Sequence, residues 1–173
     1  MLLSEIRPGN NFRYAGRTWT LLNRIEDRNL CLSVEGEGSG QYDRGMEARF
    51  DKASLGRWLN DQYYQMLLRA GGSAADFTPI LMNLAISGIG DCVHGLHAGL
   101  LSWKQWLRYS DRIPPIHAWQ WSCSLAEGIR GLGLRCMVGS GRSGYAYFQP
   151  NQRDPIVRPA ISLLNSAEVR SEE

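Results

Sequence analysis

The stretch Ile156-Val-Arg-Pro-Ala-Ile-Ser-Leu-Leu164 decides how this chain folds. It is mostly apolar, but Arg158-Pro159 interrupts it, and a polar segment follows. Because proline has no backbone N–H to donate to a sheet, we expect a strand here to lie at an edge or to bend at Pro159. A strand so late in a chain usually pairs with a much earlier one. The sequence therefore predicts a sheet that holds strands from both ends of the chain.

The early strands of such a sheet are expected within residues 11–34. Residues 10–17 alternate Phe12 and Tyr14 with polar neighbours and turn at Ala15-Gly16, and 18–22 is β-branched and aromatic. This order is typical of a β-hairpin, and 29–34 is a third short strand after a polar turn. The sequence thus predicts an antiparallel meander at the start of the chain.

Two segments have the apolar periodicity of helices. In the first, apolar residues between 55 and 67 form one stripe, which predicts a helix from Asp51 to about Arg69, capped by Asp51 or Ser54. The second lies over 100–107, and the proline-rich link 113–116 follows it.

The last third of the chain returns to strand patterns. Strands are predicted at 119–124, 131–138 and 145–148, with a glycine-rich turn at 139–144. A further short strand, 91–96, lies between the two helices. Strands at both ends with helices between them indicate an α+β fold with a mostly antiparallel, twisted sheet and two main helices.

Length and composition indicate one ordinary globular domain. The chain has 173 residues, of which 43% are hydrophobic and 21% charged, and a net charge of +2. We therefore expect a single domain, 1–173, with flexible ends at 1–8 and 165–173. A net charge of +2 is too small to imply nucleic-acid binding by itself. The six tryptophans are interpreted mainly as core residues.

The sequence predicts a cytoplasmic protein. It has neither the pattern of a targeting segment nor an apolar run of the length that crosses a membrane. The cysteines Cys31, Cys92, Cys123 and Cys136 are widely spaced without a Cys-x-x-Cys pair, as expected of reduced thiols. A disulfide pair stays open if the source is extracellular.

Four stretches, taken in order, resemble a family of uncharacterised bacterial and phage domains related to the C-type-lectin-like fold. They are Arg17-Thr-Trp-Thr-Leu-Leu22, then Ser54-Leu-Gly-Arg-Trp-Leu-Asn60 with Tyr63-Tyr64, then Asp91-Cys-Val-His-Gly-Leu96, and finally Trp119-Gln-Trp-Ser-Cys-Ser124 with Val157-Arg-Pro-Ala160. The resemblance covers about residues 8–164, with His94 in place of the usual aromatic residue. It implies a sheet in which the two chain ends meet and a scaffold for recognition through loops, although a fold does not fix a function.

The leading functional hypothesis is a non-catalytic module that binds a protein partner, as a monomer or a homodimer and without a cofactor. A specific variant is a phage or mobile-element accessory protein that inhibits a bacterial defence complex, in the manner of an anti-CRISPR protein. Aromatic residues and arginine dominate protein interfaces, so they are the expected anchors. The predicted partner-binding residues are Trp103, Trp106, Tyr109, Arg142, Tyr145 and Tyr147.

Nucleic-acid binding is the first alternative. Basic residues alternate with aromatic ones in two parts of the chain, and such sets bind single strands by charge and stacking, although they also occur on ordinary solvated faces. The members are Lys104, Trp106, Arg108, Tyr109 and Arg112 in the first part, and Arg130, Arg135, Arg142, Tyr145, Tyr147 and Arg153 in the second.

An enzyme with an unrecognised site is the second alternative. Cys123 or Cys136 with His117 would supply a nucleophile and a base, although their spacing does not require it. The glycine-rich stretch 139–144 would suit an anion but lacks the Walker pattern, so a hairpin turn is the favoured interpretation.

No metal site is predicted. The pattern Cys92-x-His94-x-x-His97 offers three zinc-ligand types in six residues but has no evident fourth ligand. Asn60-Asp61 follows a Trp-Leu pair, but on a helix, which does not suit the converging oxygens that calcium needs.

Overall fold

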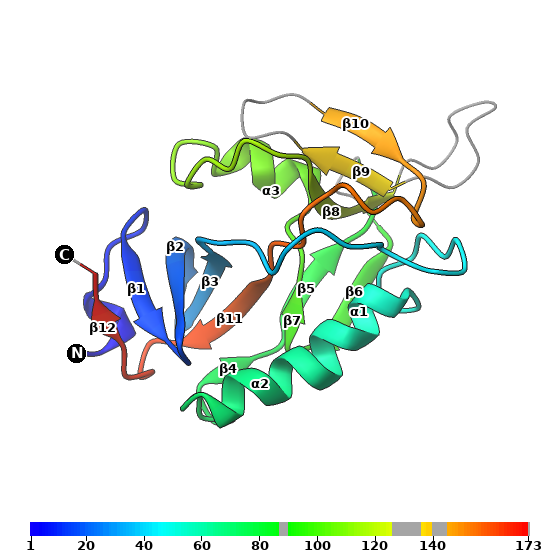
Figure 1. Ribbon diagram of the computed structural model, residues 1–173. Coiled ribbons are helices and arrows are strands. Elements are labelled where there is room, and N and C mark those ends of the chain that lie inside the picture. Colours follow the sequence, from blue (N-terminus) through cyan, green and yellow to red (C-terminus); the bar gives the residue numbers. More distant parts are fainter. Residues whose placement is uncertain (87–89, 126–135, 140–144, 173) are drawn as a thin grey trace.

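The computed structural model describes residues 1–86, 90–125, 136–139 and 145–172 (Figure 1). The helical elements are η1 (Leu3–Glu5), α1 (Ser54–Trp58), η2 (Leu59–Tyr63), α2 (Tyr64–Arg69) and α3 (Trp103–Arg108). The strands are β1 (Asn11–Tyr14), β2 (Arg17–Ile25), β3 (Arg28–Ser33), β4 (Phe77–Thr78), β5 (Ile80–Asn83), β6 (Cys92–Leu96), β7 (Ala98–Gly99), β8 (Gln120–Leu125), β9 (Cys136–Gly139), β10 (Tyr145–Phe148), β11 (Ala160–Leu164) and β12 (Arg170–Ser171). The fold is α+β, with mostly antiparallel sheet, as predicted.

The predicted early meander is confirmed. β1 and β2 pair antiparallel, with Tyr14 opposite Arg17, so Ala15 and Gly16 alone form the turn. Both turn residues have positive φ, 50° and 70°, which is the backbone of the tight turns that match strand twist. β3 then pairs with β2, and the buried indole of Trp19 donates a hydrogen bond of 3.0 Å to the carbonyl of Tyr14.

The closing strand β11 lies inside the large sheet, whose order is β12-β1-β2-β3-β11-β4 with β7 also paired to β11. Its pairing with the early strand β3 confirms the predicted meeting of the two ends of the chain. The expectation of an edge strand is wrong, because β11 pairs with β3 on one side and with β4 and β7 on the other. The strand begins at Ala160, so Pro159 lies just before it. Pro159 contributes its carbonyl, which accepts a hydrogen bond from the backbone N–H of Ser33.

Residues from both terminal segments, 1–8 and 165–172, for which flexible ends were expected, pack against the sheet. Leu3 and Ala167 are fully buried, and the backbone N–H of Leu3 donates to the carbonyl of Ala167 at 2.9 Å. β12 pairs antiparallel with β1, so the two termini lie on one side of the molecule (Figure 1). Apolar side chains from both segments thus belong to the core.

The three consecutive elements α1, η2 and α2 form the long first helix, which ends at Arg69 as predicted. The side chains of Leu55, Leu59, Tyr63 and Leu67 recur every four residues and are buried, so one stripe faces the core. Figure 1 shows this helix alongside β5, β6 and β7. No helix in the described ranges is both long and apolar enough to span a membrane.

A carboxylate from the preceding loop caps this helix. The Oδ1 atom of Asp43 accepts from the backbone N–H of Ser54 at 2.7 Å, and Oδ2 accepts from Gly45 and Glu47 at 2.6 and 2.9 Å. Ala53 occupies the N-cap position and has no side-chain cap. The prediction that Asp51 or Ser54 caps this helix is therefore wrong. The cap is Asp43, eleven positions before the helix begins.

Asp43→Asn is expected to lower the free energy of unfolding by about 1–2 kcal/mol at pH 7, the range for the loss of a helix cap. Burial alone would raise the pKa of Asp43, but its hydrogen bonds from backbone N–H groups lower it below the ordinary value. The unfolded chain thus binds the proton more readily, and the contribution of Asp43 is lost as pH falls below about 4.

Urea unfolding at a series of pH values measures this effect. The difference between wild type and Asp43→Asn should be largest at neutral pH and should shrink on acidification. Asp111→Asn is the control, because that carboxylate is 73% exposed and should change stability little. A difference that is independent of pH would contradict the assigned cap.

Aromatic rings form part of the core, several of them around Trp121 of β8. The side chains of Trp19 and Trp121 are 0% and 1% exposed, which confirms the interpretation of these two tryptophans as core residues. The ring of Tyr42 lies 5.4 Å from that of Trp121 and 6.2 Å from that of Phe50, both edge-on. Such edge-to-face pairs stabilise a core beyond the area that they bury.

Arg158, only 1% exposed, connects three parts of the chain by hydrogen bonds to oxygen atoms. Its Nε donates to the carbonyl of Ser33 at 2.7 Å and its Nη2 to that of Val34 at 3.1 Å. Its Nη1 donates to the carbonyl of Pro114 at 2.8 Å and to Oε1 of Gln120 at 3.3 Å. Burial lowers the pKa of Arg158 to about 10, so the guanidinium is still charged at neutral pH.

Candidate functional site

The second helix is held in place by a capping box and a contact to the small sheet. Ser102 Oγ accepts from the backbone N–H of Gln105, whose side chain accepts in return from the N–H of Ser102 at 2.9 Å. The backbone N–H of Trp103 donates to Ser124 Oγ on β8 at 2.9 Å. The helix α3 therefore presents the same face to solvent in a fixed orientation.

Trp103 and Leu107 lie on that outer face of α3, and Tyr145 of β10 lies beside Trp103. The rings of Trp103 and Tyr145, from α3 and β10, are 5.5 Å apart at an angle of 60°. Tyr145 is 54% exposed, Leu107 is 52% exposed, and Trp103 is half-buried. Leu107 follows Trp103 by four positions and so lies on the same side of the helix. We call Trp103, Leu107 and Tyr145 the aromatic surface.

The other predicted partner-binding residues divide into two groups. Trp106 and Tyr109 are 8% and 6% exposed, so they are corrected from surface anchors to core residues. They occupy the face of α3 that packs inward, and Arg108 covers the ring of Tyr109 at 5.8 Å. Arg142 and the side chain of Tyr147 lie outside the described residues.

The sequence interpretation missed Leu107. Leu107 was expected within the apolar stripe of this helix, although at ~100° per residue it lies about 40° from Trp103 and about 100° from Trp106. The available signal was the charge of Lys104 and Arg108, because Leu107 lies between Trp103 and these two residues around the helix.

The residues on and just after β6 that could bind a metal do not form a site. Cys92 and His94 are exposed, while the ring of His97 stacks on Tyr64 at 4.1 Å. The described part of the chain holds no group of three His, Cys, Asp or Glu side chains placed for a metal. Asn60 is also engaged, since its amide accepts from the N–H of His97 at 2.7 Å and donates to the carbonyl of Ala98 at 2.8 Å.

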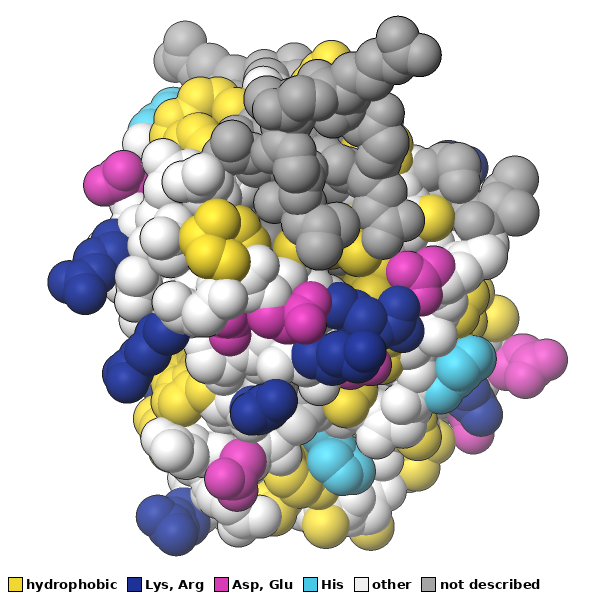
Figure 2. All heavy atoms as spheres, turned by 90° about the vertical axis from the view of Figure 1, so that its right-hand side faces the viewer, with side chains coloured by type: hydrophobic (Ala, Val, Ile, Leu, Met, Phe, Trp, Pro, Cys, Tyr) yellow, Lys and Arg dark blue, Asp and Glu magenta, His cyan; other side chains and the backbone are white. Residues whose placement is uncertain are grey.

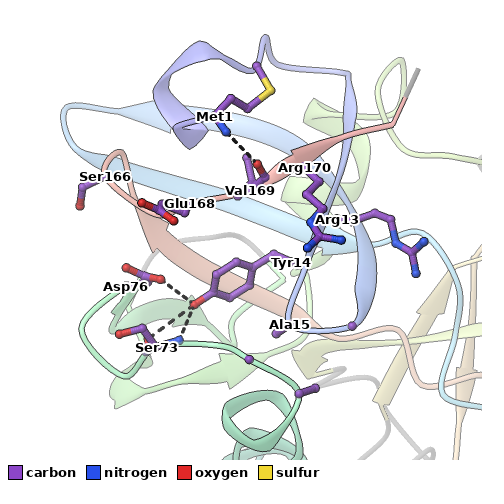
Figure 3. A pocket seen from close by; sticks show the side chains of 13 residues that line it. Met1, Arg13, Tyr14, Ala15, Ser73, Asp76, Ser166, Glu168, Val169 and Arg170 are labelled. Carbon is purple, nitrogen blue, oxygen red and sulfur yellow. Dashed lines mark hydrogen bonds between the residues drawn. The ribbon is translucent and has the colours of Figure 1, made fainter.

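A large polar hollow, about 920 Å³ in volume, lies where β1, β12 and the loop after α2 meet (Figure 3). Tyr14 points across it, donating from its hydroxyl to Asp76 Oδ2 at 2.9 Å and accepting from the N–H of Ser73 at 3.0 Å. Burial raises the pKa of the Tyr14 phenol, and the contact with Asp76 raises it further. This hydroxyl is therefore a fixed structural link and stays protonated at neutral pH.

Two arginines also line this hollow from paired strands. Arg13 on β1 lies directly opposite Arg170 on β12 in the register of the sheet. Like charges in such positions destabilise a sheet. Arg13 also makes an ion pair, with 3.9 Å between its Nε atom and Oε1 of Glu172. Asp76 and Glu168 line the hollow as well, so its charges are mixed.

Of the two thiols considered as nucleophiles, the structure describes the side chain of Cys123. Cys123 is fully buried, and burial raises the pKa of its thiol to about 12, so it is protonated at neutral pH. His117 is exposed, whereas the side chain of Cys136 and the stretch 140–144 lie outside the described residues. Cys31 and Cys123 are free thiols in the core.

Charges of both signs are mixed on the face shown in Figure 2. Lys and Arg side chains there alternate with Asp, Glu and apolar ones. On the surface, Arg49 lies between two carboxylates, 2.8 Å from Asp51 and also in contact with Asp91. The side chains coloured on this face form no continuous basic stripe of the kind that commonly follows a nucleic-acid backbone.

Comparison with known proteins identified no relative of this chain. No protein-family model, no curated protein and no solved structure matches the chain.

Proposed function

We propose that this protein is a non-catalytic binding module whose aromatic surface contacts a protein partner. The observation that carries the proposal is the exposure of Leu107 and Tyr145 beside the ring of Trp103. Tryptophan and tyrosine contribute large contact areas at a small cost in side-chain entropy, which is why they dominate interface energies.

The charges beside the aromatic surface define the kind of partner. Lys104 and Arg108 are exposed on the same helix, and neither makes an ion pair with a described residue. A matching surface would offer an apolar depression for Trp103 and Tyr145, with Asp or Glu at its rim. The partner in this proposal is therefore a protein with an acidic, partly apolar surface.

The scaffold in this proposal is C-type-lectin-like, and its location is the cytoplasm. The large sheet that joins early and late strands supports the first part, because the family resemblance implies that arrangement. The free thiols of Cys31 and Cys123 support the second, since reduced cysteines are usual in the cytosol.

The double variant Trp103→Ala/Tyr145→Ala is expected to lose the partner. The test is affinity capture with the tagged protein from a bacterial lysate, treated with nuclease and washed in about 0.5 M salt, where surface charge is screened. Each anchor is worth about 2 kcal/mol or more, so the double variant should retain less than a tenth of the captured partner.

Ile25→Ala is the matched control, because Ile25 is 66% exposed on β2, away from α3 and β10. It should capture as much partner as the wild type, and equal melting temperatures should show that both variants fold. Equal capture by all three proteins would refute the assigned surface. Loss of every captured partner on nuclease treatment would favour the nucleic-acid alternative.

A further inference from the structure

A second surface, distinct from α3 and β10, lies where the segment after β3 meets the segment before β11. These segments run side by side in Figure 1, and Ser39 forms an antiparallel bridge with Ile156. Two hollows of about 660 and 520 Å³ open beside them and share four lining residues. We call this continuous hollow the groove; its shared lining is Ser39, Gly40, Gln41 and Arg44.

The backbone of the groove is firmly anchored. The N–H of Gly40 donates to the carbonyl of Pro155 at 3.2 Å, and the N–H of Asp43 donates to that of Pro150 at 2.9 Å. The N–H of Arg44 donates to Ser54 Oγ at the start of α1. The guanidinium of Arg44 therefore extends from a fixed point of the chain.

Two arginines give the groove its charge. Arg44 and Arg153 are both exposed and line the first hollow together. Neither makes an ion pair with any residue that the structure describes. The acidic residue in the lining, Glu37, is already bound by Arg17 at 2.8 Å. Two unneutralised guanidinium groups at one hollow attract an oxyanion, with phosphate as the best geometric match.

An aromatic ring lines the other end of the groove. Trp58 of α1 is half-buried, and its ring lies 5.4 Å from that of Tyr63 at a tilt of 37°. Tyr63 is completely buried, so it supports the indole from the inner side. A supported indole beside a cationic site suits a planar ring joined to an anion.

Glycine keeps the middle of the groove open. A Cβ atom built on Gly40 meets no atom within 4 Å, and Gly40 lines both hollows. Its φ is not in the left-handed region, so a larger residue fits the backbone there. A side chain at this position would occupy the groove without altering Arg44, Arg153 or Trp58.

We infer that the groove binds a nucleotide, with its phosphate on Arg44 and Arg153 and its base against Trp58. The two arginines supply forked donors for the phosphate oxygens, and the ring supplies stacking that is tolerant of base identity. The ligand is either a free nucleotide or one nucleotide of a single strand, which share this chemistry. This site is independent of the aromatic surface.

Isothermal titration calorimetry with adenosine 5′-monophosphate tests the inference. We expect a dissociation constant on the order of 10–100 μM, as is reasonable for a ligand of this size. Arg44→Ala and Arg153→Ala should each weaken binding about tenfold or more, and Gly40→Leu should abolish it. Arg57→Ala is the charge-matched control, because Arg57 is exposed on α1 and does not line the groove.

Two further probes identify the ligand class. Inorganic phosphate should bind more weakly than the nucleotide, and Trp58→Ala should remove that difference. A labelled single strand of about ten nucleotides tests the other source. If the strand alone binds, and the groove variants abolish its binding, the ligand is a nucleotide within a strand.

The inference is overturned if neither nucleotide nor strand binds at millimolar concentration. It is also overturned if the groove variants, with melting temperatures equal to the wild type, bind as the wild type does. Equal affinities for phosphate and nucleotide would overturn the role of the planar ring. The variants Trp103→Ala and Tyr145→Ala should leave nucleotide binding unchanged, so this result is separable from partner capture.

Discussion

Arg158→Ala is expected to lower the free energy of unfolding by about 4 kcal/mol, as for the removal of one partner from a buried charged network. The guanidinium is 1% exposed and donates to the carbonyls of Ser33, Val34 and Pro114. Without it, these acceptors stay buried without their donor, and a cavity opens where β3 and β8 share this side chain. For a chain of this length, about 4 kcal/mol corresponds to a fall in melting temperature of about 8–16 °C.

Two related variants separate the causes of this loss. Arg158→Met keeps much of the side-chain volume but cannot donate, so we expect most of the destabilisation to remain. Arg158→Lys keeps the charge but cannot reach several carbonyls at once, and should be intermediate. The control is Arg7→Ala, because Arg7 is exposed in the segment before β1. Chemical denaturation of these variants measures all the differences, and a stability of Arg158→Met equal to wild type would refute the hydrogen-bonded role.

Gly56→Ala is expected to destabilise the protein by about 3 kcal/mol, opposite in sign to the usual effect of replacing glycine by alanine in a helix. Gly56 is buried in α1, and a Cβ atom there would overlap the backbone carbonyl of Phe50. Because that carbonyl belongs to the main chain, either the helix or the loop before it must move. The ring of Phe50 is fully buried against Tyr42, so this movement would disturb the aromatic core.

Gly99→Ala is the matched comparison. A Cβ atom at Gly99 in β7 would overlap the side chain of Met82, whose thioether is flexible and adjusts more readily than a main-chain carbonyl. We therefore expect a loss of about 1 kcal/mol or less there. If thermal unfolding gave equal losses for the two glycines, the rigid contact with Phe50 would not be the cause.

The parts of the fold that were predicted from the sequence have local signals. The turn at Ala15-Gly16 needs only two residues that tolerate a positive φ angle, and both residues have a positive φ in the structure. The helix that ends at Arg69 is specified by an apolar stripe every three or four residues. Antiparallel neighbours and helix periodicity are encoded over short distances, so the α+β class was predictable.

The parts that were not predicted depend on distant residues. Asp43 caps a helix that begins eleven residues later, and its own neighbours give no sign of that role. Arg158 reads in the sequence as an interruption of an apolar strand, whereas its guanidinium bonds to oxygens contributed by residues 33–34 and 114–120. Long-range hydrogen bonds of this kind leave no pattern in the local sequence.

The candidate site was predicted only in part, because it too depends on contacts between distant residues. Trp103 and Tyr145 meet at the surface, but Trp106 and Tyr109 belong to the core. The apolar side chains of this six-residue helix form one broad stripe, and only the charged residues Lys104 and Arg108 indicate which edge of the stripe is exposed. The groove was missed because Arg44 and Arg153 come together only when the segment before β11 pairs beside the segment after β3.

The pairing of β11 with the early strand β3 has a consequence for how the protein is made. Ala160 pairs with Leu32, so 128 residues separate the two halves of this ladder. A ribosome adding about 5–20 residues per second needs roughly 6–26 s to synthesise that interval. During this time β3 has an unpaired edge, and contacts of such long range also slow the folding step itself. The nascent chain would therefore benefit from chaperones that shield strand edges until residue 164 has emerged from the ribosome.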